Sequence, residues 1–411
     1  MDLSDFDRRL SRPVRMRANE FQRDGRLKHV LFSAQFSREL LERLCRMADM
    51  IRELAKSKQG SDQLRSLLSH KRAMLYFTQP STRTFLSFMA ACQILGLTCN
   101  EVRDPSTSSE VKRESPIDSI RMFSSYFDLI IMRSKIPNFA ECCGYLMNDL
   151  ERQERRSVPI INGGAGTDQH PTQALLDVYT IQRTFQFDHD EQDRRSRFME
   201  LRKCYTDLTL GPDQKTYAFC GDLGRGRTVR SLVELLTLFD DIKLFFIAPE
   251  HDTLQLDPNL RRQLIDSGIE IQEFDSLDAT INGKPVLEQI DCLYMTRIQR
   301  EHNKGSESDE IDKIDLSHFR LSPERVARMK SFAPILHPFP RDSVVGEIPT
   351  VIDEDPRAMY FRQARNGMWA RAALLVHLFD NVDDLHFMYN REFRELAVSY
   401  THLTLPTTVF V

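Results

Sequence analysis

Hydroxyl groups and one arginine follow a short apolar run that ends at residue 77. The run 74–77 is followed by Ser81, Thr82, Arg83 and Thr84, and the apolar spacing after Thr82 predicts a helix that begins there. A helix N-terminus favours anions, because its first N–H groups have no partner in the helix and its dipole is positive. Helix capping would explain Ser81 but not Arg83. The stretch is therefore a candidate phosphate site.

Polar residues also follow the other apolar runs of strand length. In chain order these are Arg133 after 129–132; Gly163, Gly164, His170 and Gln173 after 158–161; Gly221 to Arg227 after 217–220; Arg297 and Gln299 after 293–295; and His337 to Arg341 after 334–336. Ligands of parallel sheets bind beyond the carboxyl ends of the strands. Arginines from four strand ends would repel one another unless anions lie between them. The pattern predicts a phosphorylated small molecule and a substrate with carboxylates.

Other phosphate chemistries lack their residue patterns. The strand ends carry no cluster of Asp, Glu and His, so we expect no metal and no cofactor. Nothing matches G-x-x-x-x-G-K-[ST], which argues against nucleotide hydrolysis. The stretch 221–226 is similar to a dinucleotide loop but lacks the third glycine, so a dehydrogenase is the least favoured interpretation. Transfer of a group from the phosphorylated molecule is the chemistry that remains.

The elements that would position these residues alternate along the chain. Besides the strands above, the sequence predicts a strand over 244–247, a helix over 37–54 and a helix from residue 82 that Gly96 ends. Uniformly apolar strands between amphipathic helices indicate parallel sheets covered on both faces, so the fold class is α/β. The hydrophilic stretches 187–214 and 300–313 are interpreted as solvated loops. The stretch 103–114, taken alone, is interpreted as a mobile polar loop.

Composition and charge limit the class of protein. The chain has 411 residues, 41% hydrophobic and 28% charged, which is too long for one core and favours two domains. The net charge of −4 gives no reason to expect nucleic acid or an anionic membrane as a partner. Asp2, Asp5 and Arg8 stand where a signal peptide would be apolar, which favours a cytoplasmic location. The 8 cysteines form no C-x-x-C pair, so neither disulfides nor zinc are expected.

The two ends of the chain are interpreted separately. Residues 1–26 form a polar, arginine-rich extension that reads as an exposed arm or a short helix. Residues 398–407 read VSYTHLTLPT, which resembles the translation of a sequencing adapter. We therefore expect 398–411 to be non-native, with the true C-terminus missing, and leave this segment out of the fold argument.

In combination and in this order, the motifs closely resemble the catalytic chains of the aspartate carbamoyltransferase family, within the wider aspartate/ornithine carbamoyltransferase family. The motifs are Ser81–Thr84, Met132–Arg133, His170–Gln173, Gly226–Thr228, Met295–Gln299, His337–Arg341 and Asn366–Gly367 with Arg371. The resemblance spans about residues 28–380. It implies two doubly wound parallel-sheet domains with the active site in the crevice between them. A carbamoyl-phosphate domain would cover 27–172, completed by 367–397, and an aspartate domain would cover 173–366.

Carried over residue by residue, the resemblance implies these roles. Ser81, Thr82, Arg83 and Thr84 would bind the phosphate; Thr84, Arg133 and His170 would contact the carbamoyl oxygen; Gln173 and the backbone carbonyls of Phe339 and Pro340 would hold the carbamoyl amide; Arg227, Arg297 and Gln299 would bind aspartate; and Ser108 and Lys112 would enter from a neighbouring subunit of a homotrimer. The implied reaction is attack of the neutral α-amine of aspartate on carbamoyl phosphate, in pyrimidine biosynthesis, without a cofactor.

The chain departs from the family pattern at several positions. A glutamate common two residues before the phosphate-binding serine is Gln79, and an arginine common five residues after Arg297 is His302. These positions can form an ion pair across the domains in the family, so the resemblance implies a weaker closure here, not different chemistry. The leucine usual between the two prolines is Phe339, which keeps the backbone carbonyl.

Two alternatives stay open. An ornithine-type transcarbamoylase would share the phosphate half, but such chains commonly carry Arg in place of Phe85 and His-Cys in place of His337-Pro338. A cationic acceptor would also be repelled by Arg227, Arg297 and Lys112. A catalytically silent scaffold is disfavoured by the intact polar set. A regulatory chain or a dihydroorotase partner is neither indicated nor excluded.

Overall fold

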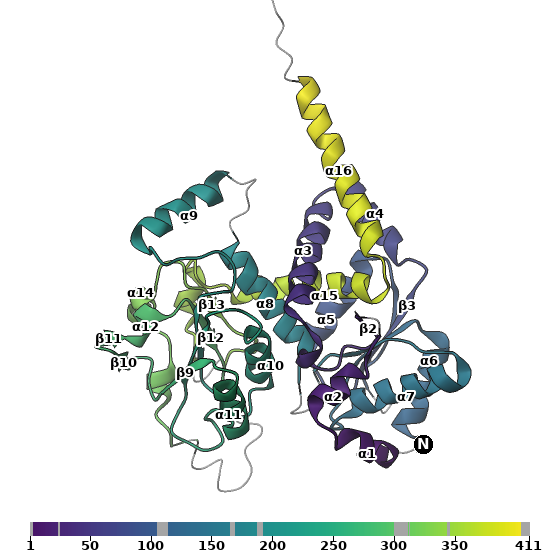
Figure 1. The fold of residues 1–411 in the computed structure, drawn as a ribbon, viewed down its shortest axis with the longest axis horizontal. Helices are drawn as coiled ribbons and strands as arrows, with labels where there is room; N and C mark the ends of the chain where they lie inside the picture. Colours follow the sequence, from purple (N-terminus) through teal and green to yellow (C-terminus); the bar gives the residue numbers. More distant parts are fainter. Residues whose placement is uncertain are drawn as a thin grey trace, which may run out of the picture. The chain divides into compact units, whose positions relative to one another are not determined.

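The computed structural model describes residues 3–23, 25–104, 114–164, 169–186, 192–299, 311, 313–342 and 346–403, without the side chains of 192–197 and 394–403. The chain forms two compact units (Figure 1). Unit 1 comprises Met1–Leu31, Glu39–Ala165 and Met368–Val411, and unit 2 comprises Phe32–Arg38 and Gly166–Gly367. Residues 32–38 and 166–172, assigned above to the first domain, thus belong to unit 2.

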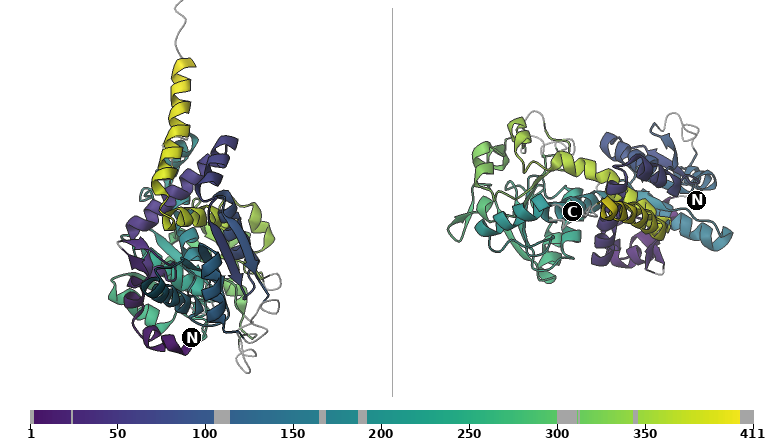
Figure 2. Two further views of the ribbon diagram at one scale, coloured as in Figure 1. Left: turned by 90° about the vertical axis from the view of Figure 1, so that its right-hand side faces the viewer. Right: turned by 90° about the horizontal axis from the view of Figure 1, so that it is seen from above.

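Unit 1 is built on a parallel sheet. Its strands are β3 (Arg72–Phe77), β4 (Thr98–Val102), β5 (Leu129–Arg133) and β6 (Ile160–Asn162), in the order β4-β3-β5-β6. The helices of this unit, labelled in Figure 1, are α3 (Arg38–Leu54), α4 (Lys58–Leu67), α5 (Thr82–Ile94), α6 (Pro116–Tyr126), α7 (Phe139–Glu154) and α16 (Val382–Leu403), with most of α15 (Tyr360–Leu378). Figure 2 gives two further views of the ribbon in the same colours. Every residue of β5 is buried, as expected of a strand covered on both faces.

Unit 2 contains a second parallel sheet. Its strands are β7 (Thr216–Cys220), β8 (Lys243–Ile247), β9 (Glu270–Phe274), β12 (Cys292–Met295) and β13 (Ile335–Leu336), in the order β13-β12-β7-β8-β9. The helices are α8 (Pro171–Phe185), α9 (Gln192–Cys204), α10 (Arg227–Leu236), α11 (Pro258–Asp266), α12 (Val286–Gln289) and α14 (Pro323–Arg328); β10 (Thr280–Ile281) and β11 (Lys284–Pro285) form a hairpin. The predicted α/β class with two parallel-sheet domains is confirmed.

The predicted elements differ from the observed ones mainly at the edges of the sheets. Each strand predicted from an apolar run is present within about two residues, but β4 and β9 were not predicted. Both are edge strands whose residues are largely exposed or half-buried, so they lack an uninterrupted apolar run. The stretch 187–214 was interpreted as a loop, and it contains α9. Its polar sequence gives no amphipathic pattern from which a helix could be predicted.

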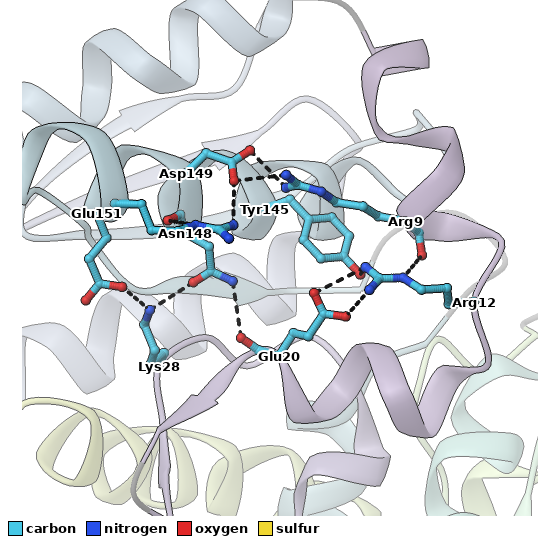
Figure 3. A network of polar contacts seen from close by, with 9 residues as sticks. Arg9, Arg12, Glu20, Lys28, Tyr145, Asn148, Asp149 and Glu151 are labelled. Atoms are coloured by element: carbon cyan, nitrogen blue, oxygen red, sulfur yellow. Dashed lines mark hydrogen bonds and ion pairs between the residues drawn. The ribbon is translucent and has the colours of Figure 1, made fainter.

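The N-terminal extension is folded onto α7 and is not an exposed arm. It forms two short helices, α1 (Asp7–Leu10) and α2 (Val14–Asn19), and a hairpin of β1 (Gln22–Arg23) and β2 (Arg26–Leu27). Arg9 donates to Asp149 at 2.9 and 3.0 Å, and Lys28 donates to Asn148 at 2.9 Å (Figure 3). Phe21 is fully buried against Gly144, where a Cβ would lie 2.9 Å from its ring. Apolar anchors and ion pairs to α7 thus hold this polar segment in place.

Candidate active site

The start of α5 follows β3 in unit 1 and carries the predicted phosphate-binding residues. Ser81 precedes the helix with an extended backbone, and among the described residues its side chain makes no capping hydrogen bond. Thr84 is buried on the helix, whereas Thr82 and Arg83 are exposed. Capping was the alternative explanation for Ser81, and the geometry does not support it. The hydroxyls and N–H groups at this helix start form a set of donors suited to an oxyanion.

Arg133 is the last residue of β5 and lies beside the ends of the two neighbouring strands. It pairs in register with Phe77 of β3. Its Nη1 donates to the carbonyl of Gly163, after β6, at 3.2 Å, and its own carbonyl accepts from the N–H of Gln79 at 3.1 Å. Only 7% of the surface of the Arg133 residue is exposed. The structure therefore brings Arg133, the segment after β3 and the glycines after β6 to one edge of the sheet.

Arg371 of α15 holds α5 from the side. Its Nη1 donates to the hydroxyl of Ser87 at 2.6 Å, and its guanidinium lies 4.7 Å from the centre of the Phe88 ring. The side chain is almost completely buried. Arg371 thus fixes the helix whose first turn carries the candidate phosphate site.

Two arginines lie beyond adjacent strand ends in unit 2. Arg227 begins α10 after β7, and Arg297 follows β12, which pairs with β7; both side chains are half-buried. Gly221 has φ +118°, and a Cβ there would lie 2.1 Å from the Thr296 carbonyl oxygen. Close packing of the two strand ends therefore explains this glycine without a dinucleotide. Guanidinium groups at two adjacent strand ends are of a type that suits carboxylates.

The buried carboxylate of Asp222 fixes the backbone near these arginines. It accepts a hydrogen bond from the N–H of Gln299 at 3.1 Å and another from Nε of Arg225 at 3.0 Å. Arg225 is thereby neutralised by Asp222, at 2.8 Å in an ion pair. Arg225 is thus held in place by the Asp222 carboxylate.

His170 and Gln173 lie at the start of α8, also in unit 2. His170 occupies the position before the helix, and its N–H donates to the hydroxyl of Ser231 at 3.1 Å. Gln173 lies on the first turn, and its Nε2 donates to Asp177 Oδ1 at 2.9 Å. Both side chains are buried. Ser231 of α10 therefore holds the backbone of His170, and Asp177 of α8 orients the Gln173 side chain.

The loop after β13 presents the carbonyl groups of Phe339 and Pro340. Phe339 has φ +58°, the Phe339–Pro340 peptide is cis, and the Phe339 N–H donates to Nδ1 of His337 at 2.8 Å. Arg341 forms two hydrogen bonds with Asp353, at 2.6 and 3.0 Å, and these raise the pKa of Arg341. Arg341 therefore anchors the loop that contains Phe339 and Pro340.

Three residues singled out from the sequence, Ser108, Lys112 and His302, lie outside the described residues. Gln79 is half-buried, and its backbone is bound to Arg133 as described above. The sequence analysis missed three buried residues of unit 2: Asp177, Tyr294 and Gln363. The four-residue spacing of Gln173 and Asp177 on one helix face could have indicated the first of these.

The candidate residues of each unit suit a different kind of ligand group. Unit 1 holds hydroxyls, N–H groups and guanidinium groups that suit a phosphate and a developing negative charge. Unit 2 holds two arginines that suit carboxylates, and amide and carbonyl oxygens that suit an N–H₂ group.

Two family descriptions match the chain. Residues 28–183 match "Aspartate/ornithine carbamoyltransferase, carbamoyl-P binding domain", and residues 213–378 match "Aspartate/ornithine carbamoyltransferase, Asp/Orn binding domain". The first match extends over α8, which is part of unit 2. Together the two matches cover most of the chain.

Individual relatives are similar over nearly the same range. The chain is 36% identical over 348 residues to the aspartate carbamoyltransferase catalytic subunit of Chromobacterium violaceum, covering 85% of this chain and 96% of that one. It is 36% identical over 352 residues to the chloroplastic aspartate carbamoyltransferase of Arabidopsis thaliana, and this match covers 85% of this chain and 77% of that one. A solved structure of aspartate transcarbamoylase from Trypanosoma cruzi, in complex with carbamoyl phosphate and aspartate, matches with a TM-score of 0.69 and 29% identity. The match covers 85% of this chain and 96% of that one.

Proposed function

The chain belongs to the aspartate/ornithine carbamoyltransferase family, and we propose that the residues described above transfer the carbamoyl group of carbamoyl phosphate to the α-amine of L-aspartate. The activity itself, aspartate carbamoyl transfer, is that of the relatives and of the structural neighbour. The products are N-carbamoyl-L-aspartate and phosphate.

The observation that carries the assignment of roles is the placement of Arg133. This buried residue ends β5, donates to the Gly163 carbonyl after β6 and accepts from the Gln79 N–H after β3. In the proposed reaction the neutral amine attacks the carbonyl carbon and negative charge develops on the carbonyl oxygen. Arg133, Thr84 and His170 stabilise this charge, while Ser81, Thr82 and Arg83 bind the phosphate. The C–O bond to phosphate then breaks, and the departing phosphate takes the proton of the amine.

The residues of unit 2 orient the two reacting groups. Gln173 and the carbonyls of Phe339 and Pro340 accept hydrogen bonds from the carbamoyl N–H₂ group. Arg227, Arg297 and the Gln299 side chain bind the two carboxylates of aspartate, with the charge-assisted geometry that guanidinium groups provide. Holding both reactants in this way lowers the barrier, because the entropy of bringing them together is lost on binding and not in the transition state.

An acceptor competition tests the proposed substrate. Purified protein is incubated with carbamoyl phosphate and equimolar L-aspartate and L-ornithine, and the products are separated. We expect carbamoyl aspartate as the product, because the acceptor side carries Arg227 and Arg297. Predominant citrulline would favour the ornithine-type alternative, and the absence of both products would favour a silent scaffold.

A homotrimer with shared active sites is part of the proposal. Ser108 and Lys112 would then act on the site of a neighbouring subunit. Lys112→Ala and Arg133→Ala should each inactivate the protein, whereas refolding the two variants together should restore activity. Restoration is expected because a mixed interface pairs an intact loop with an intact strand end. A mixture as inactive as its parents, in trimers shown by native mass spectrometry to be mixed, would contradict sharing.

We propose that the enzyme serves pyrimidine biosynthesis in the cytoplasm. None of the described helices is long and apolar enough to cross a bilayer. The name of the Arabidopsis relative places that protein in the chloroplast. Fluorescence of the tagged full-length chain in its own cells distinguishes cytoplasm from organelle.

A further inference from the structure

Asp177 is a completely buried carboxylate at the centre of a hydrogen-bond network in unit 2. Its Oδ1 accepts from Nε2 of Gln173 at 2.9 Å and from Nε2 of Gln363 at 2.7 Å. Its Oδ2 accepts from the hydroxyl of Tyr294 at 2.9 Å. Burying a carboxylate is costly unless such donors surround it. The three donors come from α8, α15 and β12, so one carboxylate links three elements.

The network continues to the loop after β13. Oε1 of Gln363 accepts from the backbone N–H of His337 at 2.8 Å. Nδ1 of His337 in turn accepts from the N–H of Phe339 at 2.8 Å. Asp177 is therefore connected, through Gln363 and His337, to the segment that presents the Phe339 and Pro340 carbonyls. The same carboxylate contacts Gln173 directly.

A carboxylate also decides which way a glutamine amide faces. An ionised carboxylate can only accept hydrogen bonds, so each glutamine must turn its N–H₂ group toward Asp177. The amide oxygen of Gln363 then faces away from Asp177 and accepts from the His337 N–H, as observed. For Gln173 the oxygen is directed away from Asp177. Tyr294 supports this polarity, because burial and the nearby Asp177 charge raise the pKa of its hydroxyl far above the usual value and keep it a donor.

We propose that Asp177 is a positioning residue that makes this site select an amide-bearing phosphate donor over an isosteric one with a methyl group. It does so by presenting oxygens, from Gln173 and the 337–340 loop, where the N–H₂ group of the donor must bind. A methyl group in that place would leave these acceptors without a hydrogen bond, which costs free energy, most of all for the buried Gln173. The inference rests on the proposed function, since it assigns the carbamoyl group to these oxygens.

The test compares two stable ligands by calorimetry on the full-length protein. Phosphonoacetamide carries the N–H₂ group, and acetonylphosphonate carries a methyl group in its place. Inorganic phosphate serves as a third ligand that needs only the phosphate side. We expect the wild-type protein to bind the amide about tenfold or more tightly than the ketone, the size of one or two hydrogen bonds.

Asp177→Leu removes the acceptor with little change in volume and should bring this ratio close to one, while phosphate affinity stays within about twofold. Asp177→Asn is the matched control: its oxygen can still face both glutamines and its N–H₂ group can donate to Tyr294, so the ratio should be retained. Gln363→Met leaves the carboxylate in place and should lower the ratio severalfold, which keeps the test decisive if the leucine variant does not fold.

Two results would overturn the role of Asp177. One is an unchanged amide-to-ketone ratio in folded Asp177→Leu, or in Gln363→Met if the leucine variant does not fold. The other is a wild-type protein that does not distinguish the ligands, although it carbamoylates aspartate. Failure of the proposed function looks different, because the wild-type protein would then form no carbamoyl aspartate at all.

Discussion

The strand ends of the two units are built in different ways. In unit 1, Arg133 is held through backbone carbonyls and backbone N–H groups of neighbouring strand ends. In unit 2, buried or half-buried carboxylates hold residues at or next to the candidate groups: Asp222 binds the Gln299 backbone N–H, Asp177 binds the Gln173 side chain, and Asp353 binds the loop anchor Arg341. A phosphate accepts hydrogen bonds from many directions, so strand and helix geometry suffices. An amide and a dicarboxylate are directional, and their recognition requires side chains that are themselves oriented.

The largest loss of activity is expected when the arginine at the end of β5 in unit 1 is replaced. Arg133→Ala should lower kcat about 10²–10³-fold, which is the usual loss when one donor to a developing oxyanion is removed. Arg121→Ala, on an exposed ion pair of the same unit with Glu154, is the matched control and should be nearly silent. Steady-state kinetics with circular dichroism as a folding check measures both. A change of only a few-fold in Arg133→Ala would mean that unit 1 does not supply this charge.

A smaller and different effect is expected from the arginines of unit 2. Arg297→Ala should raise the KM for aspartate about 10–100-fold, because a charge-assisted hydrogen bond contributes about 1.5–3 kcal/mol, and should change the KM for carbamoyl phosphate much less. Arg261→Ala, which removes an exposed pair with Glu273, is the control in the same unit. An equal rise in the KM for aspartate and in the KM for carbamoyl phosphate would contradict the separate roles proposed for the two units.

Acid should destabilise unit 1 through two buried histidines. Burial lowers the pKa of His29 to about 3 and that of His377 to about 4, with help from Lys28 and from Arg43 and Arg26. Because an unfolded histidine has a pKa near about 6.5, the unfolded state binds more protons below that pH. The free energy of unfolding is therefore unaffected above pH ~7 and falls between pH ~6.5 and the folded pKa values, by about 2 kcal/mol per histidine at pH ~5.

Urea unfolding at neutral and acidic pH measures this loss. His29 accepts a hydrogen bond from the Ile160 N–H at 3.0 Å, and His29→Asn keeps an acceptor but does not titrate. The variant should lose less stability on acidification than the wild-type protein. The same acid sensitivity in both proteins would show that His29 is not a source of the effect.

The smallest expected effects distinguish a serine proposed to bind ligand from a serine that caps a helix, both in unit 1. Ser57 caps α4 by accepting from the Gly60 N–H at 2.8 Å, whereas Ser81 does not cap α5 within the described residues. Ser57→Ala should therefore cost about 1 kcal/mol of stability. Ser81→Ala should leave stability nearly unchanged but weaken carbamoyl phosphate binding about fivefold, the loss of one hydrogen bond. Thermal unfolding and calorimetry of both variants test this pair, and a destabilised Ser81→Ala with normal binding would reverse the assignment.

The sequence predicted what depends on local pattern. Interior strands such as β5 and β7 were predicted because burial on both faces requires apolar residues throughout. The edge strands β4 and β9 were missed, because half-exposed strands carry polar residues at irregular positions. The helix α9 was missed for a related reason, since its sequence has no apolar face.

For the candidate site, the position of polar residues after strands predicted which residues come to the sheet edges, but not what each side chain contacts. Arg225 and Arg227 look equivalent in the sequence, and only the fold shows that Asp222 neutralises the first. Two partners of Asp177, Tyr294 and Gln363, are 117 and 186 residues away along the chain. No local pattern can predict such pairs without an alignment or a fold.

The central claim is our proposal that the phosphate-binding residues of unit 1 and the carboxylate-binding residues of unit 2 act on one pair of substrates. Calorimetric titration with a single molecule that joins a phosphonoacetyl group to the amine of L-aspartate tests this claim most directly. If the two sets of residues form one site, linking the halves makes the second association intramolecular, and the joined molecule should bind about 10²–10⁴-fold more tightly than phosphonoacetate alone. An affinity no higher than that of phosphonoacetate would contradict the claim.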